Sequence, residues 1–236
     1  MITLKSGGVQ YTVERSKRIT GLKITVDAER GAVVTAPLNC SVNLIEAFVK
    51  EKALWITERL QHLENMTGCR VPRKFVSGEQ LFFLGDRYTL LVKKATDYQG
   101  VLIQDREIHV AIDDVENSPG WMVKNTLVEW YVGRARQLIN ARVNLFAAAM
   151  VQKPAAIRIK KQKSRWGSCS ARGNLNFNWK LVMAPIEVID YVVVHELCHL
   201  VKLDHSAEFW YLVASLLPDY KKKRQWLREF GPALSF

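Results

Sequence analysis

Three of the five histidines in this 236-residue chain lie in one short segment, HELCHLVKLDH, which spans residues 195–205. In a helix, His195 and His199 lie on one face about one turn apart, so both can ligate one metal ion. Glu196 borders the same site, where it would take a proton from metal-bound water and later pass it to a leaving group. Because neutral imidazoles and an open coordination position suit zinc, the spacing predicts one catalytic zinc ion per chain.

The third histidine, His205, strengthens this prediction under one structural condition. It lies six residues after His199, so on a continuous helix it would point about 120° away. It can close the site only if the helix ends near Leu203 and the chain folds back. Asp204 tolerates the turn conformations that this requires, and Ser206 can cap a new helix immediately afterwards. We therefore expect His205 to be the third ligand.

Other interpretations of the segment remain open at this stage. In gluzincin proteases the third zinc ligand is a glutamate from the following helix, and Glu208 would take that role here. His205 is favoured because imidazole is a good zinc ligand and because turn residues flank it. Cys198 would be crowded as a ligand beside His199, and a small buried residue is the expected role. The plainest alternative is that the histidines are surface or core residues of an amphipathic helix.

The C-terminal half must supply the elements that position these residues. A long helix is expected from Pro119, with Ser118 as N-cap, to about Met150. Strands are expected at residues 155–162 and 175–181, with a turn-rich segment between them. Three more helices are expected: one beginning at Pro185 and carrying the histidines, one after Ser206, and one from Pro218 to just before Gly231.

The N-terminal half alternates apolar and polar residues and is predicted to be rich in strands. Strands are expected within residues 9–16 and 21–37, with a hairpin turn at Glu29–Gly31, and again within 75–112, with a hairpin tip at Asp105–Arg106. One helix, capped by Ser41, is expected to join these two strand-rich stretches. The sequence thus predicts an α+β protein with a strand-rich region at residues 1–115 and a second domain at 116–236, and no internal repeat is visible.

The net charge of +11 is unevenly distributed, because no acidic residue lies between Glu129 and Glu187. That interval contains eleven basic residues: Arg134, Arg136, Arg142, Lys153, Arg158, Lys160, Lys161, Lys163, Arg165, Arg172 and Lys180. Such a segment attracts polyanions or acidic polypeptides, or else forms a solvated face. The rival hypothesis is therefore a nucleic-acid-binding protein that uses residues 130–186, in which zinc is structural or vestigial and Cys169 closes the site.

Composition bounds the environment in which the chain works. No apolar run approaches the length of a membrane span, and the N-terminus lacks a continuous apolar segment typical of a signal peptide. The four cysteines are scattered without a CxxC pair. We therefore expect a cytoplasmic protein without disulfides or membrane partners.

The segment from SRWGSCSARGNLNFNW through the histidines to Gly231 resembles the YgjP-like metallopeptidase domain, a relative of SprT-type proteases. A looser resemblance extends to ERSKRITGLKITV, WITERL and GEQLFFLGDRYTL. It implies a zincin-like domain with the active-site helix packed on a small β-sheet, with His195, His199 and His205 as zinc ligands and Glu196 as general base. Metzincin proteases share the histidine spacing, but they have glycine at the position of Lys202 and a methionine-bearing turn downstream.

The resemblance also implies a polypeptide substrate that pairs with a strand at the rim of the site. The candidates for this rim are residues 166–170, above all Trp166, Gly167 and Ser168, and the strand at residues 175–178. The alternative for Trp166 and Gly167 is a tight turn packed under the active-site helix. Tyr220, Tyr211 and Arg165 are candidates to stabilise the developing oxyanion. A protease recruited to DNA-bound proteins would combine both functional hypotheses, and hydrolysis of a non-peptide amide also remains open.

Overall fold

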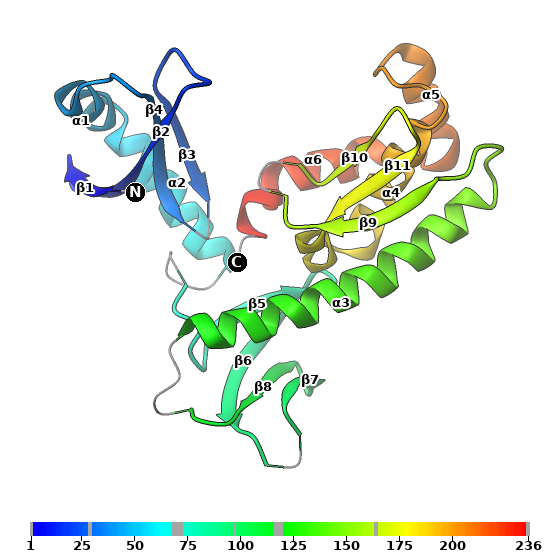
Figure 1. Ribbon diagram of the computed structural model, residues 1–236, viewed down its shortest axis with the longest axis horizontal. Helices are drawn as coiled ribbons and strands as arrows, with labels where there is room; N and C mark the ends of the chain where they lie inside the picture. Colours follow the sequence, from blue (N-terminus) through cyan, green and yellow to red (C-terminus); the bar gives the residue numbers. More distant parts are fainter. Residues whose placement is uncertain are drawn as a thin grey trace. The chain divides into compact units, whose positions relative to one another are not determined.

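The computed structural model describes residues 2–27, 30–67, 73–96, 98–115, 120–162 and 165–234. These residues form six α-helices and three β-sheets, which confirms the α+β class (Figure 1). The chain divides into two compact units, residues 1–74 and 75–234. The expected helix start at Ser118 and Pro119, and Glu29 of the first hairpin turn, lie outside the described residues.

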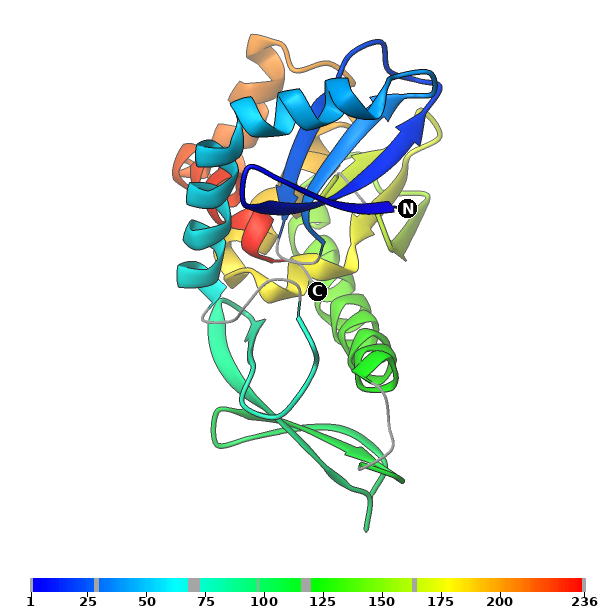
Figure 2. The same ribbon diagram turned by 90° about the vertical axis from the view of Figure 1, so that its left-hand side faces the viewer.

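The first unit is a four-stranded sheet covered by two helices. Its strands are β1 (Ile2–Ser6), β2 (Val9–Ser16), β3 (Lys23–Asp27) and β4 (Gly31–Pro37), in the order β1-β2-β4-β3. The β2–β4 pair is parallel and the other two pairs are antiparallel. Figure 2 shows α1 (Val42–Glu51) and α2 (Ala53–Thr67) on one side of this sheet, where Ile45, Val49, Ile56 and Leu63 are buried.

The prediction of a single helix after Ser41 is wrong, because the chain forms two helices, α1 and α2, with a break at Lys52. Ser41 does cap α1, since its hydroxyl accepts a hydrogen bond of 3.3 Å from the amide of Leu44. Neither proline nor glycine marks the break. It follows from tertiary packing, because α1 contacts β1 whereas α2 contacts β2, β3 and β4.

The second unit begins with a sheet that repeats the topology of the first. Its strands are β5 (Gln80–Phe83), β6 (Asp86–Lys94), β7 (Gly100–Gln104) and β8 (Glu107–Ile112), in the order β5-β6-β8-β7. The central β6–β8 pair is again parallel, flanked by two antiparallel pairs. Asp105 and Arg106 form the expected hairpin tip with φ angles of 49° and 61°. The chain therefore contains a structural repeat that the sequence does not reveal.

The rest of the second unit is built around α3 (Gly120–Ala147), which contacts elements of both of its sheets (Figure 1). The third sheet contains β9 (Ala156–Lys160), β10 (Gly167–Cys169) and β11 (Asn174–Asn178), with β11 in the centre. A 3₁₀ helix, η1 (Trp179–Met183), then leads into α4 (Ile186–Cys198), α5 (Ala207–Leu216), α6 (Tyr220–Phe230) and the short η2 (Gly231–Ala233). None of the described helices combines the length and apolar character needed to cross a membrane.

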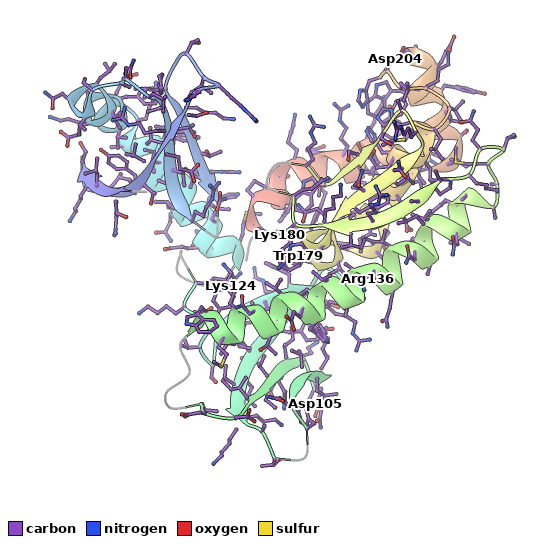
Figure 3. All side chains as sticks on the ribbon, in the orientation of Figure 1. Asp105, Lys124, Arg136, Trp179, Lys180 and Asp204 are labelled. Atoms are coloured by element: carbon purple, nitrogen blue, oxygen red, sulfur yellow. The ribbon has the colours of Figure 1, made fainter. Side chains whose placement is uncertain are left out.

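The boundary between the two compact units lies after Lys74 in the chain. The boundary expected from the sequence lies between residues 115 and 116. The second sheet groups with the C-terminal helices because it is hydrogen-bonded to them. The Tyr131 hydroxyl on α3 donates to the carbonyl of Phe82 at 2.7 Å. The amides of Leu84 and Gly85 donate to carbonyls of η1 at 2.9 and 3.0 Å. Figure 3 shows Trp179 and Lys180 of η1 close to α3, where the Trp179 and Tyr131 rings lie 5.9 Å apart.

Candidate metal and active site

Helix α4 carries His195 and Glu196, and His199 is its C-cap residue. Ile189, Val193 and Leu197 lie on it at helical spacing and are fully buried, which anchors the helix in the core. Pro185 occupies the N-cap position instead of the expected first helical position, so α4 begins one residue later than expected. Its ring fixes the backbone where the helix begins. The buried helix therefore holds His195 and Glu196 in its last turn on a rigid support.

The chain reverses after α4, as closure of the site requires. The regular helix ends at Cys198, earlier than the expected end near Leu203, and tight turn bonds extend it until the amide of Lys202 donates to the Cys198 carbonyl at 3.0 Å. An Asp204 carboxylate oxygen then accepts a 3.0 Å bond from the amide of Ser206. Ser206 is the N-cap residue of α5. Figure 3 shows Asp204 in the turn between α4 and α5.

This reversal brings the three predicted ligands together. One ligand atom from each of His195, His199 and His205 lies within 4.8 Å of the others. The Nε2 atoms of His195 and His205 are 3.2 Å apart, close to the roughly 3.3 Å expected of two nitrogens on one tetrahedral zinc ion. Among the described residues, no aspartate, glutamate or cysteine joins this group. The set is therefore three imidazoles from one helix end and the following turn.

The surroundings of His199 also fit a metal ligand. Its Nδ1 atom is 2.9 Å from the backbone carbonyl of Lys202, so Nδ1 carries the proton and Nε2 keeps its lone pair for a metal ion. The Phe209 ring, fully buried on α5, stacks on the His199 imidazole with ring centres 4.4 Å apart. The hydrogen bond and the stack together fix the orientation of this ring.

Burial and neighbouring charges favour the neutral forms of His195 and His205. Burial, together with the neighbouring His199 and His205, lowers the pKa of His195 to about 3. Burial and the charge on His199 also lower the pKa of His205. Neutral imidazole is the form that binds a metal ion, so the residues present fit the metal that the spacing predicts.

Glu196 lies beside the histidines in a buried position, with only 5% of its surface exposed. Burial raises the pKa of its carboxyl group to about 8, while the Arg165 guanidinium opposes this shift. Its Oε2 atom has no hydrogen-bond partner among the described residues. A carboxyl group whose pKa lies close to neutral pH can both take up and release a proton, which suits it to general acid–base chemistry.

Strand β10 fixes the position of Glu196 through Gly167. A Cβ atom on Gly167 would lie 2.5 Å from Oε1 and 2.6 Å from Cγ of Glu196, closer than packed atoms allow. The backbone of β10 therefore lies directly against the carboxylate. Only glycine permits this close approach. Gly167 therefore positions the Glu196 side chain, whether or not Gly167 also contacts the substrate.

We expect Gly167→Ala to lower kcat for peptide hydrolysis by about 10- to 100-fold, because the added methyl group must displace Glu196 or β10. Zinc stoichiometry should be unchanged, since no histidine is among the nearest contacts of that methyl group. The matched control is Gly133→Ala on α3, where a Cβ atom meets nothing within 4 Å. Equal activity of the two variants would show that the contact with Glu196 does not matter.

An ion pair ties α4 to α3. The Arg142 guanidinium donates to both carboxylate oxygens of Asp190, at 2.5 and 2.6 Å. The hydrogen bond to Asp190 raises the pKa of Arg142. Since Asp190 lies five residues before His195 on the same helix, the pair fixes α4 close to the metal ligands.

Asp190→Ala should lower the free energy of unfolding by about 2–4 kcal/mol, because it leaves a partly buried guanidinium without its partner. Urea denaturation measures this change. The exposed pair of Asp86 with Arg106, at 3.7 Å, provides the comparison, and Asp86→Ala should cost less than about 1 kcal/mol. Equal losses in the two variants would contradict a structural role for the Arg142–Asp190 pair.

The predicted rim residues occupy different environments. Gly167 lies against Glu196, and Ser168 points to the opposite face of the sheet, where its hydroxyl accepts a 3.3 Å bond from Asn176. The indole ring of Trp166 lies against Gly231, where a Cβ atom would approach it to 3.1 Å. The Trp166 ring therefore packs at the end of α6, and both substrate contact and a tight turn under the active-site helix stay predictions.

The three residues predicted to stabilise the oxyanion differ in how close they lie to the histidines and Glu196. Arg165 is exposed but close enough to Glu196 to lower the pKa of that carboxyl group. Tyr220 is buried and stacks on Trp210, next to the histidines. Tyr211 is 78% exposed, and the ring contacts among the histidines involve Phe209 and Trp210 but not Tyr211.

The rival ligands lie outside the histidine group. Glu208 is mostly exposed and pairs with the Lys202 ammonium group. The Cys169 thiol donates to the Ser170 carbonyl at 3.5 Å, and burial raises its pKa. Burial raises the pKa of the Cys198 thiol to about 12, in keeping with the small buried residue that the sequence predicts.

Sequence reasoning missed an aromatic and cationic wall around the histidines. Trp210 lies 5.7 Å from the ring centres of both His195 and His205. The guanidinium of Arg224 lies over the Trp210 ring at 4.8 Å, although Arg224 was not among the site residues expected from the sequence. Trp210 lies four residues after the N-cap residue Ser206, about one turn into α5. That spacing was the available sequence signal that Trp210 lies near His205.

Residues 20–230 match the family model of the YgjP-like metallopeptidase domain. No curated protein matches the chain. Among solved structures, the crystal structure of the metallopeptidase zymogen of Pyrococcus abyssi abylysin is similar with a TM-score of 0.31 and 23% identity, over 43% of this chain and 93% of that chain.

Proposed function

The chain belongs to the YgjP-like metallopeptidase family, and from this we propose that it is a zinc-dependent peptidase with Glu196 as general base. One observation carries the proposal: the ligand atoms of His195, His199 and His205 lie within 4.8 Å of one another, with no fourth protein ligand among the described residues. Three protein ligands with an open position are characteristic of catalytic zinc sites, whereas structural sites use four. A closed structural or vestigial site is therefore disfavoured.

Bound zinc would supply a Lewis acid that polarises a peptide carbonyl and activates water. His195, His199 and His205 would hold the ion, with His199 oriented by the Lys202 carbonyl. The Glu196 carboxylate would take a proton from the attacking water and return it to the departing amine. The buried position of Glu196 supports both steps, because it keeps bulk water from competing for that proton.

The substrate backbone would pair with β10, one of the two edge strands of the third sheet. The strand at residues 175–178, expected as part of the rim, is β11, which lies in the centre of the sheet and has no free edge. Gly167 at the start of β10 touches Glu196, so a peptide lying along β10 would pass close to the general base. This zincin-like arrangement, an active-site helix under a small sheet with an exposed edge, remains part of the proposal. Arg165 and Tyr220 are the two oxyanion candidates that lie near the site.

The proposal is tested by cleavage of casein. Zinc-loaded wild-type protein should generate new peptide N-termini that mass spectrometry detects, and a chelator should stop their formation. If the zinc-loaded protein leaves casein and its tryptic peptides intact, peptide hydrolysis is the wrong activity. Cleavage that continues in excess chelator would instead point to a contaminating protease of another class.

Nucleic-acid binding through residues 130–186 stays a prediction. Several of these cations have partners within the protein: Arg142 pairs with Asp190, the Lys153 ammonium group donates to the carbonyls of Ala147 and Met150, and Arg134 lies over Trp130. We expect DNA binding, if it occurs, to weaken steeply as salt rises from 50 to 200 mM, which fluorescence anisotropy would measure. Absence of binding at 50 mM would remove this hypothesis.

A further inference from the structure

Two helices that pack on α4 build one wall of the site. Trp210 on α5 lies beside His195 and His205, and Tyr220 on α6 stacks on Trp210 at 5.2 Å with the rings 13° from parallel. Arg224 lies one turn after Tyr220 on α6, with its guanidinium carbon 4.8 Å from the centre of the Trp210 ring. The wall thus places a cation on the aromatic ring that borders two of the three histidines.

Arg224 differs from the neighbouring cations in its partners. Lys202 pairs with Glu208, and Lys223 pairs with Asp219. Arg224 is exposed, and among the described residues it forms no ion pair or hydrogen bond, only the stack on Trp210. The guanidinium is therefore near the site and available to a ligand.

An unpaired cation beside a metal site works against metal binding, since like charges repel. The same cation favours a negatively charged substrate. Stacking on an indole ring holds a guanidinium flat and leaves the N–H groups at its edge exposed, and these form a fork that matches a carboxylate. A carboxylate near the scissile bond would supply the partner that Arg224 lacks within the protein.

We propose that Arg224, held on Trp210, is a specificity-determining residue that selects peptides with a carboxylate close to the scissile bond. This inference rests on the proposed peptidase function. The carboxylate can come from an acidic side chain or from the C-terminus of a peptide, because a guanidinium recognises both in the same way. Arg224 contacts the substrate but not the reacting atoms. Its effect therefore appears in the ratio of kcat/KM between carboxylate and neutral substrates.

The test uses quenched fluorescent peptides of one neutral sequence. In one series a single glutamate occupies each position in turn, with glutamine in the matched peptide; in the other a free C-terminus is compared with the amide. We expect at least one carboxylate peptide to exceed its neutral partner about 10-fold in kcat/KM, in line with a charge-assisted hydrogen bond. In Arg224→Gln this ratio should fall to about 1. Arg228→Gln, which removes the same charge one turn away, should keep it.

Two results would overturn the inference. Wild-type protein could prefer no carboxylate peptide in either series. Alternatively, Arg224→Gln could slow carboxylate and neutral peptides by the same factor, which would place Arg224 at the developing oxyanion instead. If wild-type protein cleaves no peptide at all, the peptidase proposal fails by itself. Affinities of the same peptide pairs for zinc-loaded Glu196→Gln protein, with and without Arg224→Gln, then still decide whether Arg224 selects the carboxylate.

Discussion

Glu196→Gln should lower kcat for peptide hydrolysis by about 10²- to 10⁴-fold, the contribution typical of a general base. Glutamine has nearly the same shape but can neither accept nor return a proton. The change should also leave the fold intact, because the Glu196 carboxyl already holds a proton easily: burial raises its pKa to about 8. Steady-state kinetics on protein with a measured zinc content would determine the effect.

The zinc content of the Glu196→Gln variant separates a loss of chemistry from a loss of metal. We expect one zinc per chain in both proteins, since Glu196 is not among the three grouped ligands. KM should change little, because the loss concerns proton transfer rather than substrate binding. Full activity in the zinc-loaded variant would rule out Glu196 as the base, whatever the role of the histidines.

His205→Ala should weaken zinc binding by at least 10²-fold, because it removes one of three ligands and leaves two imidazoles on one helix face. His205 is exposed in the turn after α4, so its replacement should cost little stability in the metal-free protein. Competition with a chromophoric chelator measures the affinity, and circular dichroism verifies the fold. Hydrolysis should fall in parallel with zinc occupancy.

Glu208→Ala is the matched comparison, because Glu208 is the rival third ligand. Its carboxylate pairs with Lys202 and lies outside the histidine group. We expect its loss to change zinc affinity by less than about 3-fold, consistent with an exposed ion pair. If Glu208→Ala lost zinc while His205→Ala retained it, the ligand set would be that of the gluzincin alternative.

Local patterns were enough to predict the segment that brings the three histidines together. The spacing of His195 and His199 depends only on helix geometry, and the turn residues Asp204 and Ser206 lie next to one another in the chain. The same holds for the hairpin tip at Asp105–Arg106. In each case, the residues that decide the structure lie within about ten positions of each other, so a single sequence contains the necessary information.

Features that depend on long-range contacts could not be predicted in this way. The break at Lys52 has no local signal, since it reflects which strands α1 and α2 contact. Two sheets with the same strand order arise from pairings that the sequence alone does not display. The contact of Gly167 with Glu196 joins residues 29 positions apart. Arg224 could not be placed near the histidines from the sequence, because its contact Trp210 lies on another helix.

The most direct test of the metallopeptidase account is a zinc titration of metal-free protein, with hydrolysis of a quenched peptide measured at each step. Activity should be absent without metal, rise in proportion to added zinc, and reach a plateau at one equivalent per chain, as expected for a single three-histidine site. Stoichiometric zinc binding without any hydrolysis, or hydrolysis that does not depend on zinc, would contradict the account.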